Sequence, residues 1–260
     1  MRRSQTVRSN FIPNSLKGLA RLKRQLISVL LGTLLCLAAL PRTAQPKSTP
    51  VVATRAAASA PVALAGLSPD VMNMALGAVQ CAVTSGDIHP PNTLTVIDYS
   101  RPSTEPRLWV FDLNQRALLF HELVAHGRNS GDNIATHFSD AMNSRETSLG
   151  LFVTADTYIG NNGYSLRLNG LERGFNGNAR DRAIVMHGAA YVSEQFAASQ
   201  GHLGRSWGCP ALREGIARQV IDTIRGGGVI FSYYPDSNWL KTSHYLNCAK
   251  AATIATLATS

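Results

Sequence analysis

The chain has 260 residues, of which 45% are hydrophobic and 16% charged, with 25 Lys and Arg against 16 Asp and Glu. Eight of the basic residues and none of the acidic ones lie in residues 1–44, which leaves 17 basic against 16 acidic residues (25 less 8) in the remainder. The excess positive charge therefore does not indicate nucleic-acid binding, which needs basic side chains clustered on the folded surface.

The N-terminal segment resembles an export signal. A basic stretch is followed by fifteen mostly apolar residues, 26–40, which is short for a membrane-spanning helix but long enough for the apolar core of a signal peptide. We expect residues 1–44 to be a signal peptide or an uncut signal anchor, which would be the only membrane attachment. The expected location is the periplasm or cell envelope.

Two further regions follow this segment. Residues 45–67 are rich in Ala and Pro and are expected to be a linker. Residues 68–260 have the length of one domain. That domain should open with a helix, because Ser68-Pro69-Asp70 combines a cap, a first-turn proline and a first-turn acid. The helix should end near Gly86.

The central part of the domain changes to a strand-like pattern. Alternating or β-branched runs predict strands at residues 93–99, 107–113, 117–124, 151–154, 164–168 and 182–187. Helical spacing predicts helices at 191–199 and 213–224. A last strand is predicted at 229–234. Since strands outnumber helices and recur in hairpin-like runs, the fold class expected is mainly β with a few helices (α+β).

Three cysteines lie in the domain: Cys81, Cys209 and Cys248. In an oxidising compartment spare thiols tend to pair. A Cys81–Cys248 disulfide would join the two ends of the domain and leave Cys209 as the odd thiol, whereas the alternative is two buried free cysteines. No CxxC or HExxH spacing occurs, so no metal site is predicted.

Cys209 and His187 carry the strongest chemical signal. A thiol is a strong nucleophile as thiolate, and an imidazole is a common base for it. His187 ends a predicted strand, and Cys209 follows Gly208 in a loop. The amides of Gly208 and Cys209 could face an oxyanion, and Ser206 would either bond near the thiolate or shape the turn. This pairing predicts cysteine acyl transfer. Rival bases are His121, His126, His137 and His202.

The same residues resemble a known family. His187-Gly188, followed by Ser206-Trp207-Gly208-Cys209, is similar to the active-site signature of the YkuD-type L,D-transpeptidases. The resemblance covers roughly residues 92–236 and is strongest for the murein L,D-transpeptidase catalytic domain branch. Its other matching runs are residues 108–113, 124–127, 148–150, 164–168 and 204–212. The resemblance implies a β-sandwich catalytic domain over residues 68–260.

Two positions depart from the commoner pattern of that family. Trp207 stands where a second histidine usually precedes the Gly-Cys pair, and Ala211 stands where an arginine often follows the cysteine. Arg205 or Arg213 would have to supply that charge. Within the resemblance, the catalytic residues are Cys209, His187, Ser206 and Gly208, and those expected to bind substrate are Arg205, Trp207 and Gly188.

The resemblance also implies a reaction. Such enzymes act on the stem peptides of peptidoglycan, where the cysteine attacks the carbonyl of the third residue and expels the terminal D-alanine. The thioester then passes to an amine of a neighbouring stem (L,D-transpeptidation) or to water (L,D-carboxypeptidation). Neither a cofactor nor a metal is expected, and carbapenems are expected inhibitors.

Other protein classes fit the motif less well. Papain-type and NlpC-type peptidases place the cysteine before the histidine, whereas here His187 precedes Cys209. Sortases share the order but use a wider gap and an arginine on a later strand. A non-catalytic peptidoglycan-binding module that has kept the fold stays open as an alternative, although both His187 and Cys209 are present.

Overall fold

The computed structural model describes residues 64–248. The expected leader, residues 1–44, and most of the expected linker lie outside the described residues. A search of the described residues for a helix long and apolar enough to cross a membrane finds none.

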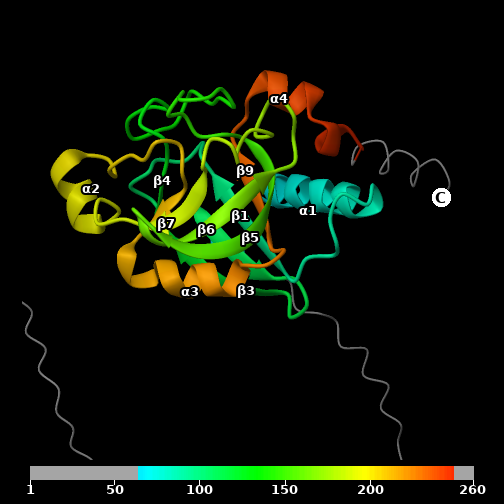
Figure 1. Ribbon diagram of the computed structural model, residues 1–260, viewed down its shortest axis with the longest axis horizontal. Helices are drawn as coiled ribbons and strands as arrows, with labels where there is room; N and C mark the ends of the chain where they lie inside the picture. The colour runs from blue at the N-terminus through cyan, green and yellow to red at the C-terminus, as the bar shows by residue number, and fades with distance from the viewer. Residues whose placement is uncertain (1–63, 249–260) are drawn as a thin grey trace, which may run out of the picture. The chain divides into compact units, whose positions relative to one another are not determined.

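Within residues 64–248 the chain forms nine strands, four named α-helices and a helical segment at residues 244–248 that reaches the end of the described range (Figure 1). The helices are α1 (Pro69–Thr84), α2 (Glu194–Gln200), α3 (Glu214–Ile224) and α4 (Ser237–Thr242). The strands are β1 (Thr93–Asp98), β2 (Leu108–Asp112), β3 (Ala117–Glu122), β4 (Val124–Ala125), β5 (Gly150–Gly160), β6 (Gly163–Gly170), β7 (Val185–Gly188), β8 (Ala211–Leu212) and β9 (Val229–Tyr233). Strand residues outnumber helical ones, which confirms the mainly β class.

All nine strands belong to one sheet, in the order β3-β2-β1-β9-β5-β6-β7-β8-β4. The two edge strands, β3 and β4, are separated in the chain by Leu123 alone. The two edges of the sheet must therefore lie close together, and the sheet is nearly closed. The expected sandwich takes the form of this single curled sheet.

Alternate side chains of the strands pack into two cores, as the period of a strand requires. On β1 and β2, Leu94, Val96 and Trp109 face a core that contains the apolar side of α1. On the same strands, Ile97 and Val110 face the other core, which contains the buried side chains of α3. Helices α1 and α3 therefore cover opposite faces of the sheet. Cys209 belongs to the second core.

Most predicted elements are present, and three features differ from expectation. The separate short strands expected at 151–154 and 164–168 are parts of one long hairpin, β5–β6, with its turn at Asn161-Asn162. Helix α4 was not predicted. Strands β4 and β8 have two residues each, too few for a sequence pattern to identify.

Residues 64–67, which belong to the expected linker, pack against the sheet. Leu67 is buried in the core beneath α1. The indole N–H of Trp109 on β2 donates a hydrogen bond to the carbonyl of Ala65, at 3.1 Å. Residues 64–67 are thus held to the sheet by apolar packing and a hydrogen bond.

The C-terminal part is held to the sheet by a disulfide and a buried carboxylate. Cys81 on α1 is bonded to Cys248 across a sequence separation of 167 residues, whereas Cys209 is a free thiol. Glu172, which follows β6, accepts hydrogen bonds from the indole of Trp239 at 3.1 Å and the hydroxyl of Ser243 at 2.6 Å. Both ends of the described chain are therefore joined to the same side of the sheet.

We predict that removal of the disulfide destabilises the domain without affecting Cys209. A link between positions 167 residues apart restricts the unfolded chain, so the double variant Cys81→Ser/Cys248→Ser should lose about 2–5 kcal/mol of unfolding free energy. Urea denaturation measures this loss. As a control, a reductant should lower the midpoint of the wild type and leave that of the double variant in place. Equal midpoints for the two proteins would contradict the prediction.

Candidate active site

Cys209 and His187 line the same cavity, which has a volume of about 730 Å³. His187 lies near the end of β7, and Cys209 lies two residues before β8. The two strands pair in parallel, with His187 opposite Ala211. The rest of the cavity is formed by the β5–β6 turn, the segment before β7 and the loop before Cys209; its residues include Tyr158, Asn161, Asn162, Arg182, Ala183, Val185, Tyr191, Arg205, Ser206 and Trp207.

The sulfur of Cys209 lies between two backbone groups of the segment that leads into β7. The N–H of Val185 donates to Sγ at 3.4 Å, and the thiol donates to the carbonyl of Ala183 at 3.8 Å. Ala183 has a left-handed φ of 53°. Burial raises the pKa of the Cys209 thiol, against the opposing effects of the Val185 N–H and the positive charge of Arg182. Only 8% of the residue is exposed.

His187 is oriented by its neighbour in the chain. Its Nδ1 lies 2.9 Å from the carbonyl oxygen of Gly188. Because a carbonyl can only accept, Nδ1 carries the proton and Nε2 keeps its lone pair. Burial lowers the pKa of His187, although the bond to Gly188 acts in the opposite direction. The ring is therefore a neutral imidazole with a free acceptor nitrogen, as a general base requires.

The resting pair is neutral rather than ionic. Burial favours the thiol form of Cys209 and the uncharged form of His187. Among the hydrogen bonds of the described chain, none joins the sulfur to the imidazole. The two groups share a cavity, but proton transfer between them would have to accompany the approach of a substrate.

The turn before Cys209 is closed by Ser206. Its hydroxyl accepts a hydrogen bond from the Gly208 N–H at 3.1 Å and donates to the Cys209 carbonyl at 2.6 Å. Ser206 therefore shapes the turn and does not bond the sulfur. The Gly208 amide is already engaged, so it is not free to face an oxyanion. The Cys209 N–H has no acceptor among the described residues and is the remaining candidate.

The three residues expected to bind substrate lie in different surroundings. Trp207 lines the cavity, is 67% exposed, and has the guanidinium of Arg145 4.8 Å above its ring. Arg205 also lines the cavity and pairs with the exposed carboxylate of Asp132. Gly188 is not among the cavity-lining residues of the described chain; its Cα faces α3, since an added Cβ would lie 3.1 Å from Ala217.

The rival histidines do not line this cavity in the described part of the chain. His126 lies in one of the runs that resemble the family, residues 124–127, but both of its ring nitrogens are engaged. Nδ1 accepts from the Arg107 guanidinium at 2.7 Å, and Nε2 donates to the Gly131 carbonyl at 3.2 Å. Burial and the Arg107 charge lower the pKa of His126 to about 4. It cannot serve as the base for Cys209.

His126 instead supports the cysteine loop through its backbone. Its carbonyl accepts a hydrogen bond from the Ser206 N–H at 2.9 Å, and the Ser206 carbonyl accepts from Arg128 N–H at 2.8 Å. Arg107, with 0% exposure, also donates to the Val124 carbonyl. A buried arginine and histidine thus fix the strand against which the loop pairs.

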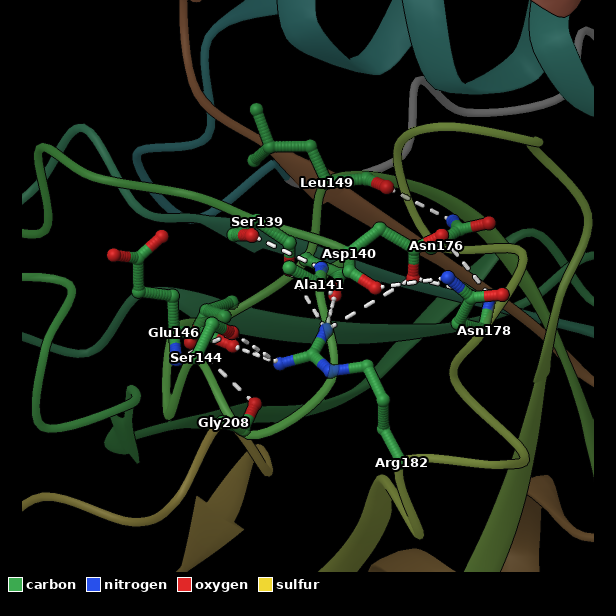
Figure 2. A network of polar contacts seen from close by, with 12 residues as sticks. Ser139, Asp140, Ala141, Ser144, Glu146, Leu149, Asn176, Asn178, Arg182 and Gly208 are labelled. Carbon is green, nitrogen blue, oxygen red and sulfur yellow. Dashed lines mark hydrogen bonds and ion pairs between the residues drawn. The ribbon is translucent and has the colours of Figure 1, made fainter.

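The charge near the thiol comes from a residue that the sequence analysis did not single out. Arg213 is bound by both carboxylate oxygens of Glu122, at 2.8 and 2.9 Å, and Arg205 is paired with Asp132. The guanidinium of Arg182 lies beside the turn at Gly208 (Figure 2). Its place as the first residue of the strand predicted at 182–187 was the only sequence signal, because its partners are distant in the chain.

Comparison with known proteins adds a family to this geometry. Among solved structures, an L,D-transpeptidase from Mycobacterium smegmatis is 15% identical with a TM-score of 0.36, and covers 55% of this chain and 59% of its own. LdtMt1 in complex with imipenem is 17% identical with a TM-score of 0.34 and the same coverages. An L,D-transpeptidase from Xylanimonas cellulosilytica is 14% identical with a TM-score of 0.32, covering 59% and 68%.

These structural likenesses are too weak to assign activity or ligands. The chain spans 59% of the length of the first two structures. No curated protein matches it. The profile of the L,D-transpeptidase catalytic domain, however, matches residues 64–233, which include His187, Cys209 and every strand of the sheet. The chain therefore belongs to the family of the L,D-transpeptidase catalytic domain.

Proposed function

We propose that the protein is an exported cysteine acyltransferase that performs L,D-transpeptidation on the stem peptides of peptidoglycan. The observation that carries the proposal is the shared cavity, which is lined both by a free thiol and by an imidazole with an unprotonated Nε2. Membership of the L,D-transpeptidase catalytic domain family supplies the reaction class.

The proposed acylation step uses both side chains. Nε2 of His187 takes the thiol proton as Sγ of Cys209 attacks the carbonyl carbon of the third stem residue. The Cys209 N–H faces the oxygen that becomes negative. The imidazolium then returns its proton to the amine of the departing D-alanine, and the carbon–nitrogen bond breaks. A thioester on Cys209 and a neutral His187 remain.

The second half reverses these roles. His187 takes a proton from the attacking amine of a second stem, the new amide bond forms, and the sulfur leaves and regains its proton. Water in place of the amine would give L,D-carboxypeptidase activity. The acceptor thus decides between the two reactions.

Export is a separate part of the proposal. It is supported by the basic and apolar composition of residues 1–44 and by the Cys81–Cys248 disulfide, since disulfides persist in oxidising compartments. The location proposed is the periplasm or cell envelope, where peptidoglycan is found. We also propose that carbapenems acylate Cys209, as β-lactam carbonyls offer a similar target to the thiol.

The first test supplies purified tetrapeptide muropeptides and follows the products by mass spectrometry. We expect release of D-alanine with formation of cross-linked dimers, no product with Cys209→Ala, and a loss of about 10²–10⁴-fold with His187→Gln. His137→Gln, at an exposed position outside the cavity, is the matched control and should keep full activity. Tripeptides without dimers would favour the carboxypeptidase alternative. Turnover by Cys209→Ala would contradict the enzymatic proposal.

The second test is the pH dependence of thiol reactivity. Because burial raises the pKa of Cys209, its alkylation by iodoacetamide should increase with pH and reach half its maximum above the ordinary thiol value of about 8.5. The variant Cys209→Ala gives the background labelling of the fourth cysteine of the sequence, Cys36, which lies in residues 1–44. A rate already at its maximum near neutral pH would indicate a preformed thiolate–imidazolium pair and contradict the neutral resting state.

The loss of muropeptide turnover at low pH tests the role of His187 as the base. Burial lowers the pKa of His187, so the neutral base persists to lower pH than an exposed imidazole. We therefore expect muropeptide turnover to fall only below the ordinary histidine value of about 6.5. Loss of turnover at a higher pH would show that a different group is titrating.

A further inference from the structure

Arg182 is a buried cation that joins two segments far apart in the chain. Only 3% of its side chain is exposed. Its guanidinium points into the segment 139–148 (Figure 2). Nη1 donates to the Ser139 carbonyl at 2.7 Å and to the Ser148 hydroxyl, and Nη2 donates to the Ser144 hydroxyl at 3.0 Å and the Glu146 carbonyl at 2.7 Å.

The partners of this guanidinium are mostly neutral oxygens. The nearest carboxylate, that of Asp140, is 3.9 Å from Nη1, and it accepts hydrogen bonds from the Asn178 N–H at 3.0 and 3.1 Å. Glu146 contributes its backbone oxygen rather than its side chain. A planar guanidinium suits this arrangement, because its fixed N–H fork can bond several carbonyl and hydroxyl oxygens at once.

The segment held by Arg182 lies directly against the turn that carries Cys209. A Cβ added to Gly208 would lie 2.7 Å from the Glu146 carbonyl oxygen and 3.3 Å from Nη2 of Arg182. The hydroxyl of Thr147 also reaches the Gly208 carbonyl at 3.5 Å. Gly208 has a φ of 117°, so this close approach and the backbone angle both require glycine.

The backbone of Arg182 leads to the other side of the sulfur. The next residue is Ala183, whose carbonyl accepts from the Cys209 thiol, and two residues further Val185 donates its N–H to Sγ. The side chain of Arg182 therefore supports the turn that carries Cys209, through the segment 139–148. The residues that follow Arg182 in the chain contact the sulfur itself.

We propose that Arg182 is a positioning residue for the nucleophile, because its guanidinium fixes the segment 139–148 beneath Gly208 and so sets the place of the Cys209 sulfur between Ala183 and Val185. This inference rests on the assignment of Cys209 as nucleophile, but not on the identity of the acceptor. Its positive charge also favours the thiolate that forms during attack. The ionisable groups that face it are Asp140, Glu146 and Cys209.

The test compares Arg182→Met and Arg182→Lys with Arg180→Met. Arg180 is two residues away, is half exposed, and pairs with the exposed Asp156, so it is a matched control. The first readout is the rate and pH profile of Cys209 alkylation by iodoacetamide, with Cys209→Ala as the background. The second is the melting temperature, which reports a purely structural effect.

For Arg182→Met we expect alkylation at neutral pH to fall about tenfold or more, since several hydrogen bonds from a charged group are lost, and the profile to shift to higher pH. Arg182→Lys should recover the pH profile through its charge but only part of the rate, because an ammonium lacks the planar fork. Arg180→Met should match the wild type. If Arg182→Met melts like the wild type and keeps its alkylation profile, the proposal is overturned.

A milder variant covers the case in which Arg182→Met does not fold. Ser144→Ala removes one acceptor from Nη2 and leaves the guanidinium in place. We expect slower alkylation at an unchanged melting temperature; an unchanged rate in both Ser144→Ala and Arg182→Lys would overturn the proposal. Alkylation needs no peptidoglycan, so a wild type that is alkylated normally but turns over no muropeptide would refute the proposed function alone.

Discussion

The parallel pairing of β7 with β8 is the constraint on which the site depends. It sets His187 opposite Ala211, and because alternate residues of a strand point to the same side, the residues two positions earlier, Val185 and Cys209, are also neighbours. The hydrogen bond from Val185 N–H to Sγ is the direct expression of this register. A slip of either segment by one residue would turn the side chain that it carries away from the cavity, so the sheet itself determines whether the thiol and the imidazole share that cavity.

Two buried arginines hold the loops around Cys209 that the pairing of β7 with β8 does not itself fix. Arg107 fixes the strand end at Val124 and His126, and the His126 carbonyl in turn binds Ser206. Arg182 fixes the segment beneath Gly208. Burying a cation costs free energy unless its N–H groups are satisfied. Backbone carbonyls supply most of the acceptors of Arg107 and half of those of Arg182, whose other two acceptors are serine hydroxyls. The turn before Cys209 is therefore supported on two sides by charged groups. The hydrogen-bond acceptors that these groups need are brought together only when the chain is folded.

The limits of prediction from sequence follow from the same arrangement. Cys209, His187 and the apolar strands could be identified because nucleophile chemistry and strand periodicity are local signals. Arg182 could not, because its acceptors lie 34–43 residues away in the chain and half of them are backbone atoms. The engagement of the Gly208 amide by Ser206 was missed for a related reason: the motif names the residues of a turn but not the direction of its N–H groups. Short elements such as β8 carry too few residues for any period.

The neutral state of the pair has a chemical consequence for a lone thiol in the proposed oxidising compartment. Oxidation and thiol–disulfide exchange proceed through the thiolate. Burial favours the protonated thiol of Cys209, which lines the cavity together with His187. Under the proposed function, activation is delayed until a substrate fills that cavity, when the Val185 N–H, the Arg182 charge and Nε2 of His187 act together on the departing proton. In that proposal, the features that protect the sulfur at rest also make its reactivity depend on the bound peptide.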